Sequence, residues 1–460
     1  MLRRVLYAVA AIIAIVAIAV AVLPYFVGRQ AESSFKYQVA SFNASHSAVA
    51  LHVDEYQRGF YASEADVTLS GETQDENHSF GLVFGTGATA RFHIRINHGP
   101  IPFASFGGGR VNFTPVLYTA EFRGENLPPL SFLGALKPDV HLVQYFNGAT
   151  TTHVVLPPGR FGLGAVGAIW QGGEATLHLN AARDRADYEG TIKPINFQFL
   201  VADSGATYNG ILKGIEFSGT GHKGEHDFWV GRGTNRYGGL VVTSGGSQIV
   251  ALADLQNEVV IGESANGLLL NGSSHSVLNG GTIKGWNFSR LTLQGSVAGL
   301  DATALRRGFD ALRTQADQTS KGVTAAQART VMGNALAPAV TSATIAALSL
   351  TLAAPSGSAR FAAHIGFTAP PGGTTAGASS TPVARAVGQG NLAFDQKLVD
   401  DFVAKVVNPI LPLVVDQSLK SLVTQGYLTQ TPGGGYRALI GYRAGVLTIN
   451  GRTVNPASEP

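Results

Sequence analysis

The spacing of hydrophobic and polar residues changes along the chain, and each change predicts a different kind of element. An uninterrupted apolar run extends from Val5 to Val27. About 20 such residues span the hydrocarbon core of a bilayer as an α-helix. The run therefore predicts a transmembrane segment. In residues 28–47 after it, Phe35, Val39 and Phe42 share one helical face, which predicts a membrane-proximal helix.

Alternation with a period of two begins near Ala48 and predicts β-strands. In its clearest example, Phe92, Ile94 and Ile96 alternate with three basic side chains. Such alternation is typical of a strand with one buried and one solvated face. Further short runs of this kind are Val140–Leu142, Ala175–Leu179, Phe197–Val201, Leu240–Val242, Leu268–Leu270 and Leu291–Leu293.

Two stretches depart from this alternation. Gly159–Trp170 breaks the pattern and predicts a loop or short helical turns. Ile211–Val242 is dense in glycine, which weakens strands but suits bends and bulges. We therefore expect a long antiparallel sheet that bends where the glycines gather.

Helical periodicity appears in the C-terminal third. It covers parts of 301–336 and then Leu398–Val423, where Pro409 and Pro412 should kink or split the helix. Strands are predicted between these helices. At the end of the chain, Tyr436–Asn450 reads as a hairpin with Gly445 in its turn.

The predicted fold class is mainly β (α+β), with a long curved antiparallel sheet covered by helices from the C-terminal third. The expected segments are a cytoplasmic tip (1–4), a transmembrane anchor (5–27), the membrane-proximal helix (28–47), a β-rich exported domain (48–300) and an α+β C-terminal region (301–460). The last contains a low-complexity loop at 370–382.

Charge sets the expected orientation of the anchor. Arg3 and Arg4 precede the apolar run. Positive charge stays on the cytoplasmic side, so we expect a single-pass protein of a bacterial inner membrane with its bulk in the periplasm. The alternative is a cleaved signal peptide with Ala19-Val20-Ala21 as its cleavage site. The apolar run is longer than a typical signal peptide core, which favours a retained anchor.

Composition narrows the possible functions. The chain has no cysteine, which excludes disulfides, cysteine-based metal sites and thiol catalysis. Its net charge is +3, and its basic residues form no run longer than Arg306-Arg307. Nucleic acid is therefore not an expected partner.

The short motifs that suggest chemistry lack the structural context that they need. His222–His226 matches H-x-x-E-H, but the surrounding glycines predict a hairpin tip and not the helix that would converge two histidines on zinc. G-x-G-x-x-G occurs at Gly162 and at Gly219, without the strand, helix and acidic residue of a dinucleotide site. We expect no metal, no cofactor and no enzyme activity, although carboxylates from distant strands could still converge.

Three motifs carry a resemblance. Tyr56-Gln57-Arg58-Gly59-Phe60-Tyr61-Ala62-Ser63 precedes a strand, and His98-Gly99-Pro100 ends another. The third is the C-terminal hairpin, with Tyr436, Gly445, Asn450 and Gly451. Together with the anchor, they resemble the YdgA-like family of bacterial envelope proteins, whose function is unknown. The resemblance implies a membrane-anchored periplasmic protein and supplies no catalytic residues.

Each motif also has a purely structural interpretation. Arg58 would pair with a carboxylate, Gly59 would allow a bend, and Ser63 would hydrogen-bond a turn.

Two functions compete at this stage. In the first, the protein is a scaffold or assembly factor that binds another envelope protein. In the second, an open apolar groove next to the membrane holds a lipid or another hydrophobic ligand. The candidate groove residues are Phe92, Ile94, Ile96, Phe197 and Phe199. The expected partners are thus the membrane, an envelope protein or a lipid. A second copy of the chain is a further candidate partner.

Overall fold

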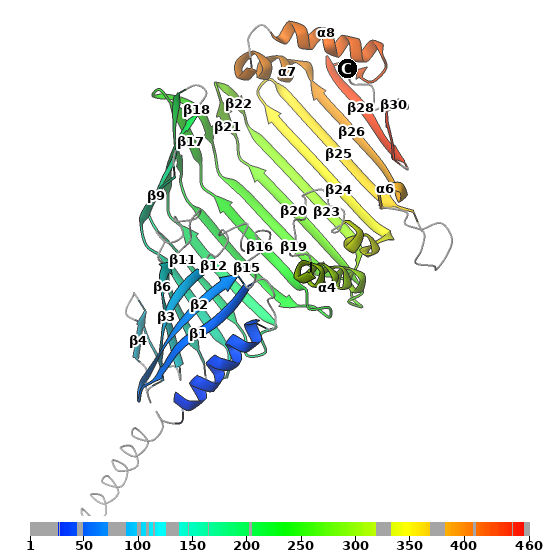
Figure 1. The fold of residues 1–460 in the computed structure, drawn as a ribbon. Coiled ribbons are helices and arrows are strands. Elements are labelled where there is room, and N and C mark those ends of the chain that lie inside the picture. Colours follow the sequence, from blue (N-terminus) through cyan, green and yellow to red (C-terminus); the bar gives the residue numbers. More distant parts are fainter. Residues whose placement is uncertain are drawn as a thin grey trace, which may run out of the picture. The chain divides into compact units, whose positions relative to one another are not determined.

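A computed structural model of the chain shows a mainly β protein (Figure 1). It describes residues 26, 28–43, 49–71, 89–98, 103–106, 110–113, 116–125, 138–145, 147–163, 165–201, 205–318, 333–368, 382–407, 411–443 and 445–454. Within these residues, no helix is both long and apolar enough to cross a bilayer. Apart from Phe26, the predicted anchor lies outside the described residues.

The chain divides into two compact units. Unit 1 comprises Met1–Phe161, Gln171–Gly190 and Arg313–Val323. Unit 2 comprises Gly162–Trp170, Thr191–Leu312 and Thr324–Pro460. The sequence predicted a single boundary near residue 300. The observed units differ from this, because the chain first enters unit 2 at Gly162, returns to unit 1 at Gln171 and enters unit 2 again at Thr191.

Unit 1 is an antiparallel sheet with a helix packed on it. Its strands pair in the order β1-β2-β3-β6-β7-β8-β11. Their bounds are β1 (Val49–Arg58), β2 (Ala62–Gly71), β3 (Thr89–Asn97), β6 (Val116–Glu125), β7 (Asp139–Gln144), β8 (Thr150–Leu156) and β11 (Gly173–Leu179). The chain also forms a hairpin of β4 (Phe103–Phe106) with β5 (Arg110–Phe113), and the strand β12 (Arg185–Ile192).

The helix predicted after the apolar run is present over residues 28–43. Its residues Ala31 and Phe35 are buried against Val67 and Ile96 of the sheet. Apolar residues one helical turn apart share a face, which explains why this side of the helix is buried. Unit 1 therefore has a filled core.

Unit 2 contains two sheets. The first, called the long sheet here, has the strand order β15-β16-β19-β20-β23-β24-β25-β26-β28-β29-β30, and β27 (Thr429–Gln430) also pairs with β28. Its other strands are β15 (Ile215–Lys223), β16 (Trp229–Tyr237), β19 (Leu255–Glu263), β20 (Leu269–Leu278), β23 (Arg290–Asp301), β24 (Val340–Ala354), β25 (Gly357–Phe367), β26 (Ala386–Asp395), β28 (Gly435–Arg443), β29 (Val446–Ile449) and β30 (Arg452–Val454).

The second sheet, called the short sheet, has the order β22-β21-β18-β17-β14-β13-β10-β9. Its strands are β9 (Gly159–Leu163), where the chain passes between units, β10 (Val166–Trp170), β13 (Ile195–Val201), β14 (Ala206–Leu212), β17 (Leu240–Ser244), β18 (Ser247–Leu252), β21 (Gly281–Ile283) and β22 (Trp286–Phe288). The prediction of a loop or helical turns at Gly159–Trp170 was wrong. Its four glycines obscure the alternation, and pairing with β13 holds β10 extended.

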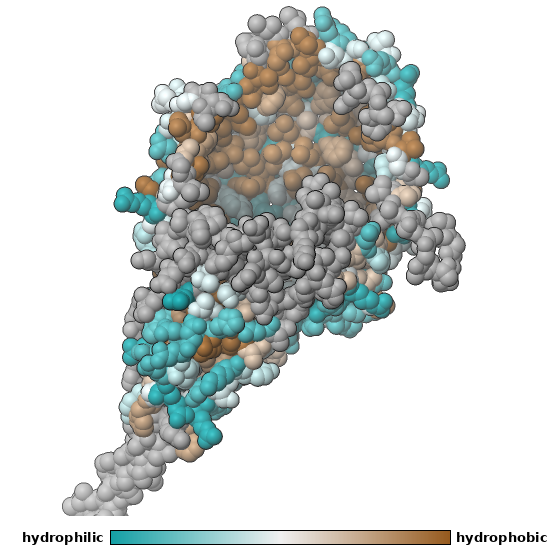
Figure 2. Space-filling model, viewed as in Figure 1, coloured by the Kyte–Doolittle hydropathy of each residue, from teal (hydrophilic) through white to brown (hydrophobic). Residues whose placement is uncertain are grey.

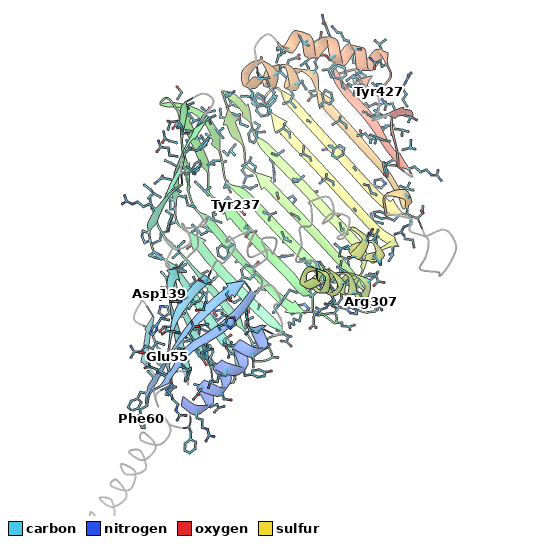
Figure 3. The ribbon with its side chains drawn as sticks, viewed as in Figure 1. Glu55, Phe60, Asp139, Tyr237, Arg307 and Tyr427 are labelled. Atoms are coloured by element: carbon cyan, nitrogen blue, oxygen red, sulfur yellow. The ribbon has the colours of Figure 1, made fainter. Side chains whose placement is uncertain are left out.

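Consecutive strands run from one sheet into the other through bends of one or two residues. Tyr237, labelled in Figure 3, ends β16, and β17 begins after Gly238-Gly239. The bends hydrogen-bond to one another: Lys213 N–H donates to Gly239 O at 3.0 Å, and Gly238 N–H donates to Gly214 O at 2.7 Å. Gly214 has φ +130°, which a residue with a side chain rarely adopts. The prediction that this glycine-rich stretch supplies bends is confirmed.

Helices lie at the two ends of the long sheet (Figure 1). At one end are α7 (Gln396–Phe402), a π-helical turn η2 (Val403–Val407) and α8 (Leu411–Thr424). The helix predicted over Leu398–Val423 is thus split, as its prolines indicated. At the other end, Ala302 and Leu305 of α4 (Ala302–Gln318) pack on Val230 and Leu270. A 3-10 turn η1 (Ala337–Ala339) and the short α6 (Pro382–Arg385) precede β24 and β26.

Two sequence predictions fall largely or wholly outside the described residues. They are the later part of the helical stretch within 301–336 and the loop at 370–382.

Candidate functional site

One face of the long sheet is apolar along most of its length. In an antiparallel pair, directly opposite residues lie on the same face. Leu348 lies opposite Ala363, and Leu350 lies opposite Phe361. The residues that alternate with these on β24 and β25 face the other way and include Ser349, Thr351, Arg360 and His364. We call the apolar side the inner face and the polar side the outer face.

The short sheet also has an apolar face. Phe197 stacks on Phe199 with ring centroids 6.4 Å apart, and Phe199 stacks on Tyr208 at 4.9 Å. Gly210 lies directly opposite Phe197. A Cβ atom on Gly210 would lie 2.1 Å from the Phe197 ring, so only glycine leaves room for this aromatic row.

The two apolar faces converge on one cluster. Trp286 and Phe288 of the short sheet pack with Leu291 and Leu352 of the inner face. The Phe402 ring of α7 meets the Trp286 ring edge-on, with centroids 5.0 Å apart. Both apolar faces therefore line the same trough, which this cluster closes at one side.

Among the residues that the structure describes, none covers the inner face between the helices at its two ends, and a hollow of about 630 Å³, called the inner hollow, lies there. Residues of five adjacent strands, β19, β20, β23, β24 and β25, line it. Three of its apolar side chains are partly exposed: Leu348 at 45%, Ile261 at 43% and Ile365 at 37%. Figure 2 shows a broad hydrophobic surface in a hollow next to α7 and α8. Contiguous exposed apolar surface of this kind marks binding sites more often than chance.

The inner hollow offers dispersion and hydrophobic contacts and few hydrogen bonds. Its five strands all pair on both sides, so their backbone groups are already bonded within the sheet. Its side chains are mainly aliphatic, with Phe361 as its aromatic member and serines of β20 and β23 as its polar members. A ligand suited to this surface is apolar and has little need of hydrogen bonds.

The outer face of the same strands is hollowed too, with a volume of about 840 Å³. Its polar side chains bond to one another. Arg232 Nε lies 2.9 Å from Glu258 Oε1, and the Gln294 amide lies 2.8 Å from His275 Nδ1. These contacts fit a solvated sheet face.

The residues predicted as a groove divide between the two units. Ile96 has 0% exposure and Ile94 packs around the same filled core of unit 1, so the assignment of these two to an open groove was wrong. Helix 28–43 covers that face of the sheet, which strand alternation alone does not reveal. Phe92 is half-buried in β3, opposite Val67. Phe197 and Phe199 lie on the apolar face of the short sheet.

The N-terminal motif residues gather around the start of helix 28–43 in unit 1. Ser63 Oγ lies 2.8 Å from His98 Nε2, and both side chains have 0% exposure. A Cβ atom on Gly28 would lie 2.6 Å from the His98 ring, so this glycine admits the histidine. Arg58 pairs with Glu32 at 3.5 Å, which is the carboxylate partner that the structural interpretation required.

Tyrosines line the same buried region. The Phe35 and Tyr56 rings lie 5.9 Å apart. Burial, and after it the neighbouring Tyr56, raise the pKa of Tyr118 to about 12. A catalytic serine must reach its substrate, and the enclosed Ser63–His98 pair does not. The pair therefore ties the end of β3 to β2.

A side chain at position 59 would have no room either, because a Cβ atom on Gly59 would lie 2.2 Å from Ala62 O. This glycine therefore sits in the β1–β2 bend for steric reasons. Gly99 and Pro100 lie outside the described residues.

The C-terminal motif is structural in the same way. Asn450 and Gly451 have φ +49° and +79° and form the turn between β29 and β30, where Asn-Gly suits two positive φ angles. Gly445 has φ +87° in the β28–β29 turn. The buried Tyr436 donates to Gln396 Oε1 of α7 at 3.2 Å. The predicted hairpin is confirmed, and its motif positions α7 over the inner face.

His222 is the second-to-last residue of β15, and His226 lies in the turn between β15 and β16, where Asp227 has φ +59°. The two histidines are therefore at a hairpin tip, as predicted. Within the described residues, no three His, Asp or Glu side chains gather as metal ligands would.

Sequence reasoning did not single out the residues of the inner hollow. The alternation of β24 and β25 was a usable signal for Leu348 and Ile365, but it does not tell a covered face from an open one.

Comparison with known proteins places the chain in one family. No curated protein and no solved structure matches the chain. Residues 4–457 match the bacterial proteins of unknown function DUF945, and the chain belongs to that family.

Proposed function

We propose that this protein binds the acyl chain of a membrane lipid in the inner hollow. The observation that carries the proposal is the open apolar inner face of β19, β20, β23, β24 and β25. Its chemistry suits a hydrocarbon because each of the five lining strands pairs with a neighbour on both sides. The proposal includes no catalytic step.

The size of the inner hollow agrees with this ligand. Five adjacent strands at about 4.8 Å spacing extend over about 19 Å. One leaflet of a bilayer is about 15 Å of hydrocarbon, which is the reach of one acyl chain. A chain lying across the strands would therefore cover the hollow from β19 to β25.

The gain from covering the exposed side chains can be estimated. Full burial of a leucine or isoleucine side chain contributes about 1.5–3 kcal/mol. Leu348, Ile261, Ile365 and the neighbouring inner-face Leu293 are each 37–45% exposed. Covering all four would contribute about 3–5 kcal/mol. That gain suits a reversible carrier or holder of lipid.

The expected location agrees with this role. An anchor at Val5–Val27, with the body on the periplasmic side as the YdgA-like resemblance implies, would keep unit 2 within reach of the inner membrane. A phosphatase fused at Pro460 should then be active, and an inactive fusion would contradict this orientation.

Photo-crosslinking tests the proposal in cells. A photoreactive amino acid replaces Leu348 in the full chain, and a matched chain carries it at Ile345, on the outer face of the same strand and 54% exposed. We expect a lipid adduct on the peptide from position 348 and little or none from position 345. A protein adduct at position 348 would favour a scaffold role, and equal lipid adducts at both positions would contradict the proposal.

A further inference from the structure

We infer that a polar patch on the inner face, formed by Asn235, Asn257, Ser274 and Ser276, binds the ester carbonyl groups of the lipid, so that the ligand is a glycerolipid. This inference rests on the proposed function and names the class of its ligand. The juxtaposition that carries it is a hydrogen-bonding patch next to the inner hollow.

The patch places polar side chains on a strand face that is otherwise apolar. The register places Asn235 opposite Asn257 and Asn257 opposite Ser276, so all three share one face. The same face carries Leu255 and Val259 on β19, two residues to either side of Asn257. Polar residues at apolar-facing positions are expected where function overrides packing.

The hydrogen bonds within the patch leave amide N–H groups that can donate to a ligand. The hydroxyls of Ser274 and Ser276 donate to Asn257 Oδ1, at 3.2 and 2.9 Å. These two bonds occupy the carbonyl side of the Asn257 amide. Within the described residues, Asn257 Nδ2 and the Asn235 amide have no protein partner. Ser274 also lines the inner hollow, so the patch and the apolar surface are continuous.

The charges around the patch decide which functional group of a lipid suits it. On the described strands β16, β19, β20 and β23, the inner-face positions carry no Lys or Arg side chain. A free fatty acid would bring a carboxylate that such a site leaves unpaired, at high cost. An ester carbonyl accepts hydrogen bonds, is uncharged and is attached directly to an acyl chain. It therefore matches both the amide donors and the adjacent apolar surface.

The test uses two fluorescent probes in the purified full chain: pyrene-labelled phosphatidylcholine and its ether-linked analogue, which lacks the ester carbonyls. We expect the wild-type chain to bind the ester form about five- to tenfold more tightly, the change that corresponds to one neutral hydrogen bond. Asn257→Leu should lower ester binding to the ether level and leave ether binding unchanged. Asn391→Leu, an exposed outer-face position on β26, is the matched control and should change neither.

Unchanged ether binding also shows that Asn257→Leu folds. If this variant loses both probes, Ser276→Ala provides the second test, and it should lower the ester preference alone. Equal wild-type binding of the two probes, or an unchanged ester preference in both variants, would overturn the inference and leave acyl-chain binding intact. Binding of neither probe by the wild-type chain would instead contradict the proposed function.

Discussion

Replacing Leu348 by aspartate should abolish lipid binding without unfolding unit 2. Leu348 projects from the middle of β24 into the inner hollow and is 45% exposed. In the empty protein, an aspartate at this position stays hydrated, so its cost is close to the strand-propensity difference of about 1 kcal/mol. A bound acyl chain would remove that water and leave a carboxylate against hydrocarbon.

The size of the effect follows from two contributions. The variant loses the contact made by the exposed part of the leucine, about 0.7–1.4 kcal/mol. It also buries an unpaired charge, which costs several kcal/mol more. Since about 1.4 kcal/mol corresponds to a tenfold change in affinity, lipid binding should fall more than a hundredfold.

The assay is the amount of lipid that copurifies with each full-length variant, measured by mass spectrometry. Ile345→Asp is the control because Ile345 lies on the outer face of the same strand and is 54% exposed. Lipid held by residues 5–27 would be common to both variants, so their difference isolates the inner hollow. The reasoning is refuted if Leu348→Asp retains the wild-type amount, or if both variants lose lipid equally while remaining folded.

Three further predictions concern stability, each measured by denaturant unfolding. Trp286→Ala removes the ring that joins the short sheet to the long sheet and α7, and should lower the free energy of unfolding by about 3–5 kcal/mol. Ser63→Ala takes away a fully buried partner of His98 and should cost about 1–3 kcal/mol; a loss below 0.5 kcal/mol would contradict its structural role. Burial, and then the charge of Asp416, raise the pKa of Asp400, so its ionised form disfavours folding and its contribution to stability falls as the pH rises through the folded pKa. Asp400→Asn should therefore raise the unfolding midpoint at pH 7, and this gain should vanish below about pH 3.8, the ordinary pKa of the carboxyl; a gain that does not depend on pH would argue against this origin.

The sequence identified most of the strands because alternation reflects burial of one face. It located β3, β24, β25 and the C-terminal hairpin, and the prolines near residue 410 predicted where the last helix divides. It failed at Gly159–Trp170, where cross-strand pairing holds glycine-rich segments extended. Local patterns do not contain the partner strand that stabilises such a segment.

The site was harder to predict, because an apolar strand face reads the same whether another element covers it or not. Ile96 and Leu348 both belong to apolar faces of alternating strands, yet helix 28–43 buries the first, whereas no described element covers the second. The bends that join the two sheets, such as Gly238-Gly239, decide which faces meet. They depend on contacts between residues far apart in the chain. The polar inner-face residues, such as Asn257, could have been noticed only once the register was known.

A crystal structure of the full chain grown in a lipidic phase tests the central claim most directly. We predict elongated non-protein density across β19–β25 in the inner hollow, in contact with Leu348 and Ile365, with its ester region at Asn257. A hollow filled by residues 319–332 of this chain, or by another protein molecule, would contradict lipid binding at this site.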